Sequence, residues 1–121
     1  MASIASFCAG PRMSLYYASK AFVRSFSEAI AEECKGSGVT VTALCPGPTA
    51  TGFEKAAYME ASNMFHLFHP AGAKDVALVG YKAMMKGQVL CYYGLSSKLI
   101  NLGVRLVPRS VARKMAKKVN G

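Results

Sequence analysis

The sequence is short of acidic residues and has no long apolar run. Six aspartates and glutamates stand against 15 lysines and arginines, which gives a net charge of +9. No stretch reaches the roughly 20 apolar residues that a membrane-spanning helix needs, so no transmembrane segment is predicted. The N-terminus has no positive cluster before an apolar run, which argues against a signal peptide. Hydrophobic residues make up 52% of the chain, which argues against disorder.

Metal-binding patterns are also missing. The four cysteines lie inside apolar stretches, and no pair has the spacing of zinc ligands: Cys8, Cys34, Cys45 and Cys91. We interpret them as reduced core cysteines of a cytosolic protein. His66 and His69 are three residues apart, but no carboxylate or cysteine joins them, so loop histidines are a better interpretation than metal ligands.

Two helices are predicted from apolar residues that recur at spacings of three and four. In residues 14–35 these residues line one face: Val23, Phe26, Ile30 and Cys34. Gly36 and Gly38 follow, and glycine is suited to the left-handed conformation that ends a helix. Residues 72–86 form the second predicted helix, which ends at Gly87.

Strands are predicted between these helices. Residues 39–45 are rich in β-branched residues and end at Pro-Gly, and residues 88–93 read as another buried strand. Residues 2–7 are short and apolar, as at the end of a further buried strand. Residues 48–70 show no clean period and predict a loop with a short helix. Strand and helix alternate along the chain, which indicates an α/β layer architecture.

The C-terminal residues 95–121 carry seven lysines and arginines and no acid. Two short amphipathic segments are predicted, residues 95–107 and 108–119, with Pro108 suited to a helix first turn. A basic amphipathic tail suits a membrane surface or a partner subunit, and a solvated face is the alternative. Nucleic acid is not expected, because the tail lacks aromatics for base stacking.

The sharpest motif is Tyr16-Tyr17-Ala18-Ser19-Lys20. On a helix, Tyr16 and Lys20 lie one turn apart on the same face. A phenol has a pKa of about 10, and a fixed ammonium favours the phenolate and lowers that pKa. The pair is therefore suited to proton transfer. Taken alone, however, Tyr-x-x-x-Lys usually marks ordinary neighbours on a helix surface.

Together with its surroundings, the motif resembles the short-chain dehydrogenase/reductase family. That family has a serine on one strand, Tyr-x-x-x-Lys on the next long helix, and a following strand that ends in Pro-Gly. Here Ser3, Tyr16 with Lys20, and Pro46-Gly47 follow in that order and spacing. The resemblance is strong over about residues 2–53 and looser over residues 71–94.

The resemblance implies a role for each residue of the motif. Tyr16 would protonate the carbonyl oxygen during reduction, or act as the base in the reverse direction. Lys20 would lower the pKa of Tyr16 and bind the nicotinamide ribose. Ser3 would hold and polarise the substrate carbonyl, and its spacing from Tyr16 favours it over Ser6. Tyr17 is excluded as the motif tyrosine, because only Tyr16 is four residues before Lys20.

The Pro-Gly turn is implied to bind the cofactor. Pro46 and Gly47 would lie along the nicotinamide, Thr49 near its carboxamide, and Thr51 closer to the carboxamide or the phosphates. Plain loop capping is the alternative for the two threonines. The implied cofactor is NAD or NADP, with NADP preferred.

The family's nucleotide-binding features are not found. The sequence has no glycine-rich turn of the kind that binds a pyrophosphate at a helix N-terminus. We therefore expect the C-terminal half of a Rossmann-type doubly wound parallel α/β sheet, as a true fragment, a misplaced start or a broken gene. Residues 1–94 would be its catalytic part, with a substrate loop at about 48–70, and residues 95–121 a basic extension. Such a chain would expose a sheet edge, and its activity alone is doubtful.

The expected partners follow from the same resemblance. The substrate would be a small carbonyl compound or alcohol, and an apolar one is suggested by the loop residues Met59, Met64, Phe65, Leu67 and Phe68. A homodimer would pair through the helix that carries Tyr16. We expect a cytoplasmic protein, with peripheral attachment to a membrane by the tail as the alternative.

Overall fold

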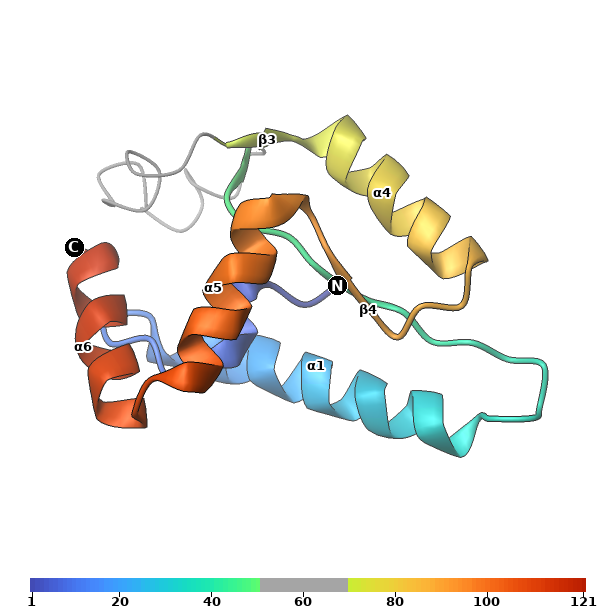
Figure 1. Ribbon diagram of the computed structural model, residues 1–121, viewed down its shortest axis with the longest axis horizontal. Helices are drawn as coiled ribbons and strands as arrows, with labels where there is room; N and C mark the ends of the chain where they lie inside the picture. Colours follow the sequence, from blue (N-terminus) through green and yellow to red (C-terminus); the bar gives the residue numbers. More distant parts are fainter. Residues whose placement is uncertain (51–69) are drawn as a thin grey trace.

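A computed structural model describes residues 1–50 and 70–121 and has the layers of an α/β protein (Figure 1). Its elements in chain order are η1 Ile4–Phe7, α1 Ser14–Glu33, β1 Ala43–Cys45, β2 Thr49–Ala50, β3 Ala71–Gly72, α4 Ala73–Met85, β4 Leu90–Tyr92, α5 Gly94–Leu106 and α6 Arg109–Val119. β1 and β4 lie between α1 on one side and α4 on the other. The predicted α/β class is therefore confirmed for this part of the chain.

β1 is the centre of the main sheet. It pairs in parallel with β4, with Ala43 opposite Leu90 and Cys45 opposite Tyr92. On its other side, the backbone N–H of Ala2 donates to Leu44 O at 2.8 Å, and the N–H of Ile4 donates to Pro46 O at 3.1 Å. Three chain segments therefore run side by side, and the turn after β1 lies next to the start of the chain.

The two helix layers are held by different contacts. Tyr17 of α1 is buried, and α1 contacts both η1 and β1. On the opposite face, α4 approaches β1 so closely that a Cβ at Gly80 would lie 2.7 Å from Leu44 Cδ2. Glycine at position 80 permits that approach. Cys45, in the sheet between the two helices, is fully buried.

Three predicted segments differ from the structure. Ile4–Phe7 forms a 3-10 helix rather than a strand, because Ser3 caps it by accepting from Ala5 N at 3.2 Å. The strand predicted at residues 39–45 begins only at Ala43, where pairing with β4 starts. Phe26, expected on one apolar face of α1, is 57% exposed and stacks on the exposed Phe22.

A second, smaller sheet was not predicted. β2 and β3 pair in parallel, with Thr49 opposite Ala71 and Ala50 opposite Gly72. This pairing joins the chain after Pro46-Gly47 to the start of α4. The loop predicted at 48–70 therefore contains strand residues at both ends, and residues 51–69 lie outside the described part of the chain.

The predicted tail helices are present and pack on the rest of the fold. α5 contacts η1, and α6 buries Ala112 and Ala116. Figure 1 shows α6 beside the start of α1. Within residues 1–50 and 70–121, no helix is long and apolar enough to cross a membrane.

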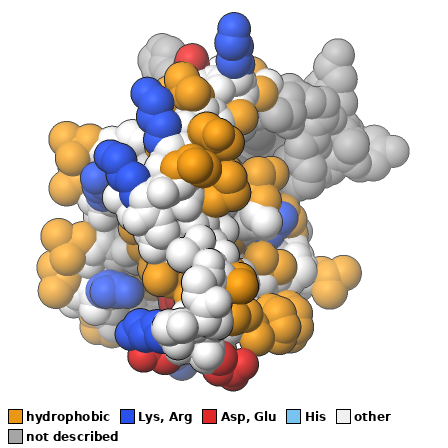
Figure 2. All heavy atoms as spheres, turned by 90° about the vertical axis from the view of Figure 1, so that its right-hand side faces the viewer, with side chains coloured by type: hydrophobic (Ala, Val, Ile, Leu, Met, Phe, Trp, Pro, Cys, Tyr) orange, Lys and Arg blue, Asp and Glu red, His pale blue; other side chains and the backbone are white. Residues whose placement is uncertain are grey.

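Apolar side chains remain on the surface outside these contacts. α4 leaves four of them exposed: Leu78, Tyr81, Met84 and Met85. Figure 2, which shows the right-hand side of Figure 1, has hydrophobic side chains standing among lysines and arginines. The layers seen here therefore leave much apolar surface without a partner.

Candidate functional site

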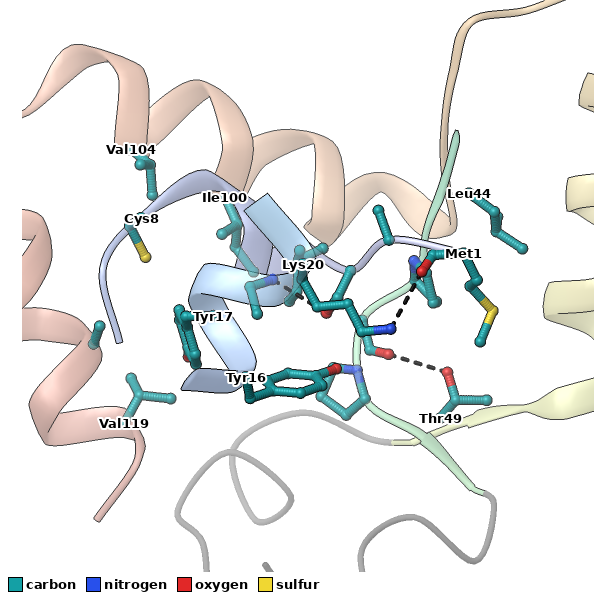
Figure 3. A pocket seen from close by; sticks show the side chains of 18 of the residues that line it. Met1, Cys8, Tyr16, Tyr17, Lys20, Leu44, Thr49, Ile100, Val104 and Val119 are labelled. Carbon is teal, nitrogen blue, oxygen red and sulfur yellow. Dashed lines mark hydrogen bonds between the residues drawn. The ribbon is translucent and has the colours of Figure 1, made fainter. Parts of the chain in front are cut away.

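A cavity of about 710 Å³ lies where η1, α1, the end of β1, α5 and α6 meet (Figure 3). Polar side chains from three segments line it: Ser3, Tyr16, Tyr17, Lys20 and Thr49. The rest of the wall is mainly apolar and includes Ile4, Leu44, Val76, Ile100, Val104 and Val119. A few polar groups in an apolar cavity of this size are typical of a small-molecule site.

Tyr16 and Lys20 lie one turn apart on α1 and point to the same side of the cavity (Figure 3). The Lys20 Nζ lies 5.7 Å from the centroid of the Tyr16 ring. It also donates a hydrogen bond to the backbone oxygen of Met1 at 3.2 Å. That bond uses one of its three protons and fixes the ammonium next to the phenol.

Ser3 lines the same cavity, whereas Ser6 does not. The Ser3 hydroxyl accepts from the backbone N–H of Ala5, so its own proton remains available to a ligand. The Ser6 hydroxyl instead donates to Ser3 O at 2.6 Å. Ser6 therefore stabilises the backbone of Ser3 by this hydrogen bond and does not itself line the cavity.

The Pro46–Thr49 segment forms the opposite wall. Pro46, Gly47 and Thr49 all line the cavity. The Thr49 hydroxyl donates to Gly47 O at 3.0 Å, which is the capping contact named above as the alternative for this residue. Thr51 lies outside the described residues, as do His66 and His69.

The Tyr17 ring contacts the Tyr16 ring edge to face, with the centroids 6.2 Å apart, and its hydroxyl is held by the C-terminus. Its hydroxyl donates to Asn120 Oδ1 at 3.0 Å, and Asn120 Nδ2 donates to Pro11 O at 3.0 Å. Burial raises the pKa of Tyr17, and the hydrogen bond to Asn120 lowers it by less. Tyr17 therefore stays protonated at neutral pH, and its role is structural.

The thiols near the cavity are protonated as well. Burial raises the pKa of Cys8, which lines the cavity, and raises that of Cys45 to about 11. Because the thiolate is the nucleophilic form of cysteine, neither group is suited to nucleophilic catalysis at neutral pH.

Sequence reasoning missed the residues that α5 and α6 bring to the cavity. Ile100 and Val104 are four residues apart on α5, and Ala112, Ala116 and Val119 follow at spacings of four and three on α6. This spacing was visible in the sequence. No signal in the sequence singled out Asn120.

The described residues supply no metal centre, but they do supply groups suited to part of a cofactor. In residues 1–50 and 70–121, no three histidine, cysteine or carboxylate side chains gather to hold a metal ion. Lys20 and the Pro46–Thr49 segment line the same cavity, and the ammonium offers hydrogen-bond donors of the kind that a ribose hydroxyl accepts. No glycine-rich turn that would bind the pyrophosphate is found in the sequence.

Comparison with known proteins identifies the family. Residues 1–61 match the short chain dehydrogenase family, which is just over half of the 121 residues. This range includes Ser3, Tyr16, Lys20 and the Pro46-Gly47 turn. No curated protein and no solved structure gives a match. The chain therefore belongs to the short-chain dehydrogenase family.

Proposed function

We propose that the chain supplies the proton-transfer part of the active site of an NAD(P)-dependent oxidoreductase that reduces a carbonyl or oxidises an alcohol. The observation that carries the proposal is the common cavity of Ser3, Tyr16 and Lys20. Those residues come from two separate segments, and a ligand in the cavity can reach all three. The cofactor would be NAD or NADP, with NADP preferred.

Tyr16 and Ser3 act on the substrate oxygen. The nicotinamide cofactor, when bound, supplies or accepts the hydride. Tyr16 gives its phenolic proton to the carbonyl oxygen during reduction, and it takes the proton back from the alcohol in the reverse direction. Ser3 donates its hydroxyl proton to the same oxygen and holds it in place.

Lys20 stabilises the phenolate that forms when Tyr16 loses its proton. Its ammonium lies over the Tyr16 ring and is anchored on Met1 O, so no rearrangement is needed when charge develops. Its two other protons are available to the ribose of the cofactor. Pro46, Gly47 and Thr49 form the wall along the nicotinamide, and we assign Thr51 to the carboxamide or the phosphates.

The substrate has an apolar body. Beyond the polar groups of α1, the cavity continues between α5 and α6 along Ile100, Val104 and Val119. Burial of apolar surface there contributes about 25 cal/mol for each Å² removed from water. The tail therefore serves the site as a wall.

We also propose that two copies of the chain pair through α1. Its outer face exposes Leu15, Phe22 and Phe26, at 84%, 68% and 57% of their surface. Apolar side chains of this size in one row mark an interaction surface. A second copy presents the same row, which satisfies the self-complementarity of a twofold interface.

A second candidate function, binding of an anionic membrane surface, is supported by α5. Four leucines on one stripe of this helix are more than half exposed: Leu95, Leu99, Leu102 and Leu106. Seven lysines and arginines follow Gly94 without any acid. A peripheral amphipathic helix lies in the membrane surface, with its leucines in the headgroup region and its cationic side chains at anionic lipids. Sedimentation with anionic vesicles at low salt tests this, and a chain left in the supernatant would contradict it.

The site of action is the cytoplasm. The four cysteines are free thiols, and reduced thiols are normal there.

For the oxidoreductase, the test is turnover after Tyr16→Phe with Tyr17→Phe as control, in protein that includes a nucleotide-binding half.

A further inference from the structure

A second cavity, of about 880 Å³, adjoins the first. It lies between the start of α1, the residues after η1, and the junction of α5 with α6. The two cavities share five lining residues, namely Cys8, Tyr17, Val104, Val107 and Ala112. These side chains form the wall between the two cavities, so a ligand in the second cavity contacts the same residues that line the first.

Four arginines line this second cavity: Arg24 from α1, Arg105 from α5, and Arg109 and Arg113 from α6. Among the described residues that line it, none is an aspartate or a glutamate. In the part of the chain that the structure describes, none of the four forms an ion pair, and the ion pair found there joins Lys35 to Glu32. The cavity thus gathers positive charge without a counterion from the described residues.

This arrangement favours an anion. Guanidinium groups keep their charge at all physiological pH values. Arg24 is half-buried, and Arg105, Arg109 and Arg113 are exposed, so their charges are accessible to an anion that enters from solvent. Such an anion accepts charge-assisted hydrogen bonds from them. Arg24 also stacks on the Phe7 ring, with its Cζ 4.6 Å from the centroid, and its buried Nε has no hydrogen-bond partner among residues 1–50 and 70–121.

The start of α6 adds a second, independent attraction. Arg109 is its first residue, and no side chain caps this N-terminus. The first N–H groups of a helix lack intrahelical partners and carry partial positive charge. Because Arg109 and Ala112 line the cavity, this positive end of α6 lies at its edge.

We propose that the arginine-lined cavity binds the phosphate group of a small organic molecule whose apolar part packs on the apolar side chains that this cavity shares with the first. A phosphate monoester carries nearly two negative charges and three acceptor oxygens, which suits several guanidinium groups better than a single carboxylate does. The shared apolar residues Val104 and Val107 offer the surface against which the apolar part packs. The proposal does not depend on oxidoreductase activity.

The test is isothermal titration calorimetry of the 121-residue chain with decyl phosphate below its micelle concentration. The double variant Arg109→Gln, Arg113→Gln should weaken binding by at least roughly tenfold. The matched control, Lys114→Gln with Lys117→Gln, loses the same charge from the same helix but not from the cavity. It should change binding by less than about twofold. Equal losses in the two double variants, or no saturable binding, would overturn the proposal.

Two further measurements keep the result interpretable. Circular dichroism checks that each variant folds. If the double variant does not fold, Arg105→Gln on α5 takes its place in the titration. Inorganic phosphate and vesicles of phosphatidic acid separate the sources of the phosphate group. We expect decyl phosphate to bind at least about tenfold more tightly than inorganic phosphate, since it also buries its chain. Arginine-dependent binding to vesicles without binding of decyl phosphate would contradict a small-molecule site.

Discussion

The side chains of Tyr17 and Asn120, 103 positions apart in the sequence, share a hydrogen bond of 3.0 Å. Tyr17 is the residue next to Tyr16, and Asn120 follows the last residue of α6. Asn120 also donates to Pro11 O, so it joins the end of the chain to both the turn before α1 and α1 itself. This contact fixes α6 as a wall of the cavity that Tyr16 lines.

Asn120→Ala is expected to loosen this wall. It removes two hydrogen bonds and should lower the free energy of unfolding by about 1–2 kcal/mol. Urea unfolding measures the change, with the exposed Lys114→Ala on the same helix as the control. The variant should also bind the fluorescent fatty acid cis-parinaric acid more weakly. Unchanged stability and binding would show that the contact does not hold α6.

Gly10→Ala is expected to displace Tyr17. A Cβ at position 10 would collide with the aromatic ring of Tyr17. Overpacking of this kind costs about 1–3 kcal/mol. Gly103→Ala is the control, because its Cβ would meet no atom within 4 Å. Thermal unfolding should show a clear loss for the first variant and none for the second, and equal midpoints would contradict the packing described for Tyr17.

The Cys45 thiol is expected to make stability fall at alkaline pH. Burial raises its pKa from 9.0 to about 11 in the folded chain, so folding favours the protonated form. This contribution is complete below the unfolded pKa and is lost as the pH rises toward the folded value. Urea unfolding between pH 9 and 11 should show a steeper fall for the natural chain than for Cys45→Ala. Parallel curves would contradict it.

Replacement of the exposed phenylalanines of α1 is expected to abolish pairing of the chain. Phe22→Glu with Phe26→Glu places two carboxylates at the centre of the proposed interface, where like charges of the two copies would repel. Multi-angle light scattering should show a dimer for the natural chain and a monomer for the variant. Glutamates in place of Leu78 and Tyr81 on α4 provide the control, which should remain dimeric. A natural chain that is monomeric at all concentrations would contradict the proposal.

The larger elements were predictable from the sequence. The apolar spacing in residues 14–35 and 72–86 predicted α1 and α4, and both predicted ends have glycine at positive φ, at Gly36 and Gly87. A long run of apolar residues at helical spacing and a glycine that can adopt the left-handed conformation are both local features. They can therefore be recognised without knowledge of the tertiary fold. The cavity at Ser3, Tyr16 and Lys20 also agrees with the motif spacing.

Elements that depend on distant partners were not predictable. β2 and β3 have two residues each, and they form only because Thr49 pairs with Ala71, which is distant in the sequence. Phe26 fits the helical period, yet it is exposed because that edge of α1 has no partner among the described residues. The predicted strand at residues 2–7 contains enough apolar residues, but the cap from Ser3 favours the 3-10 turn.

The central claim is that Tyr16 transfers the proton. It is tested most directly by the rate of NADPH oxidation with a panel of apolar ketones, in protein that includes a nucleotide-binding half, taken from the DNA upstream of the Met1 codon or from a related reductase. Tyr16→Phe should lower kcat by roughly a hundredfold to ten-thousandfold while NADPH binding, followed by fluorescence, stays nearly unchanged. Tyr17→Phe should keep most of the activity, because it loses only the bond to Asn120. Turnover by Tyr16→Phe at the natural rate would contradict the assignment of this cavity as the site of proton transfer.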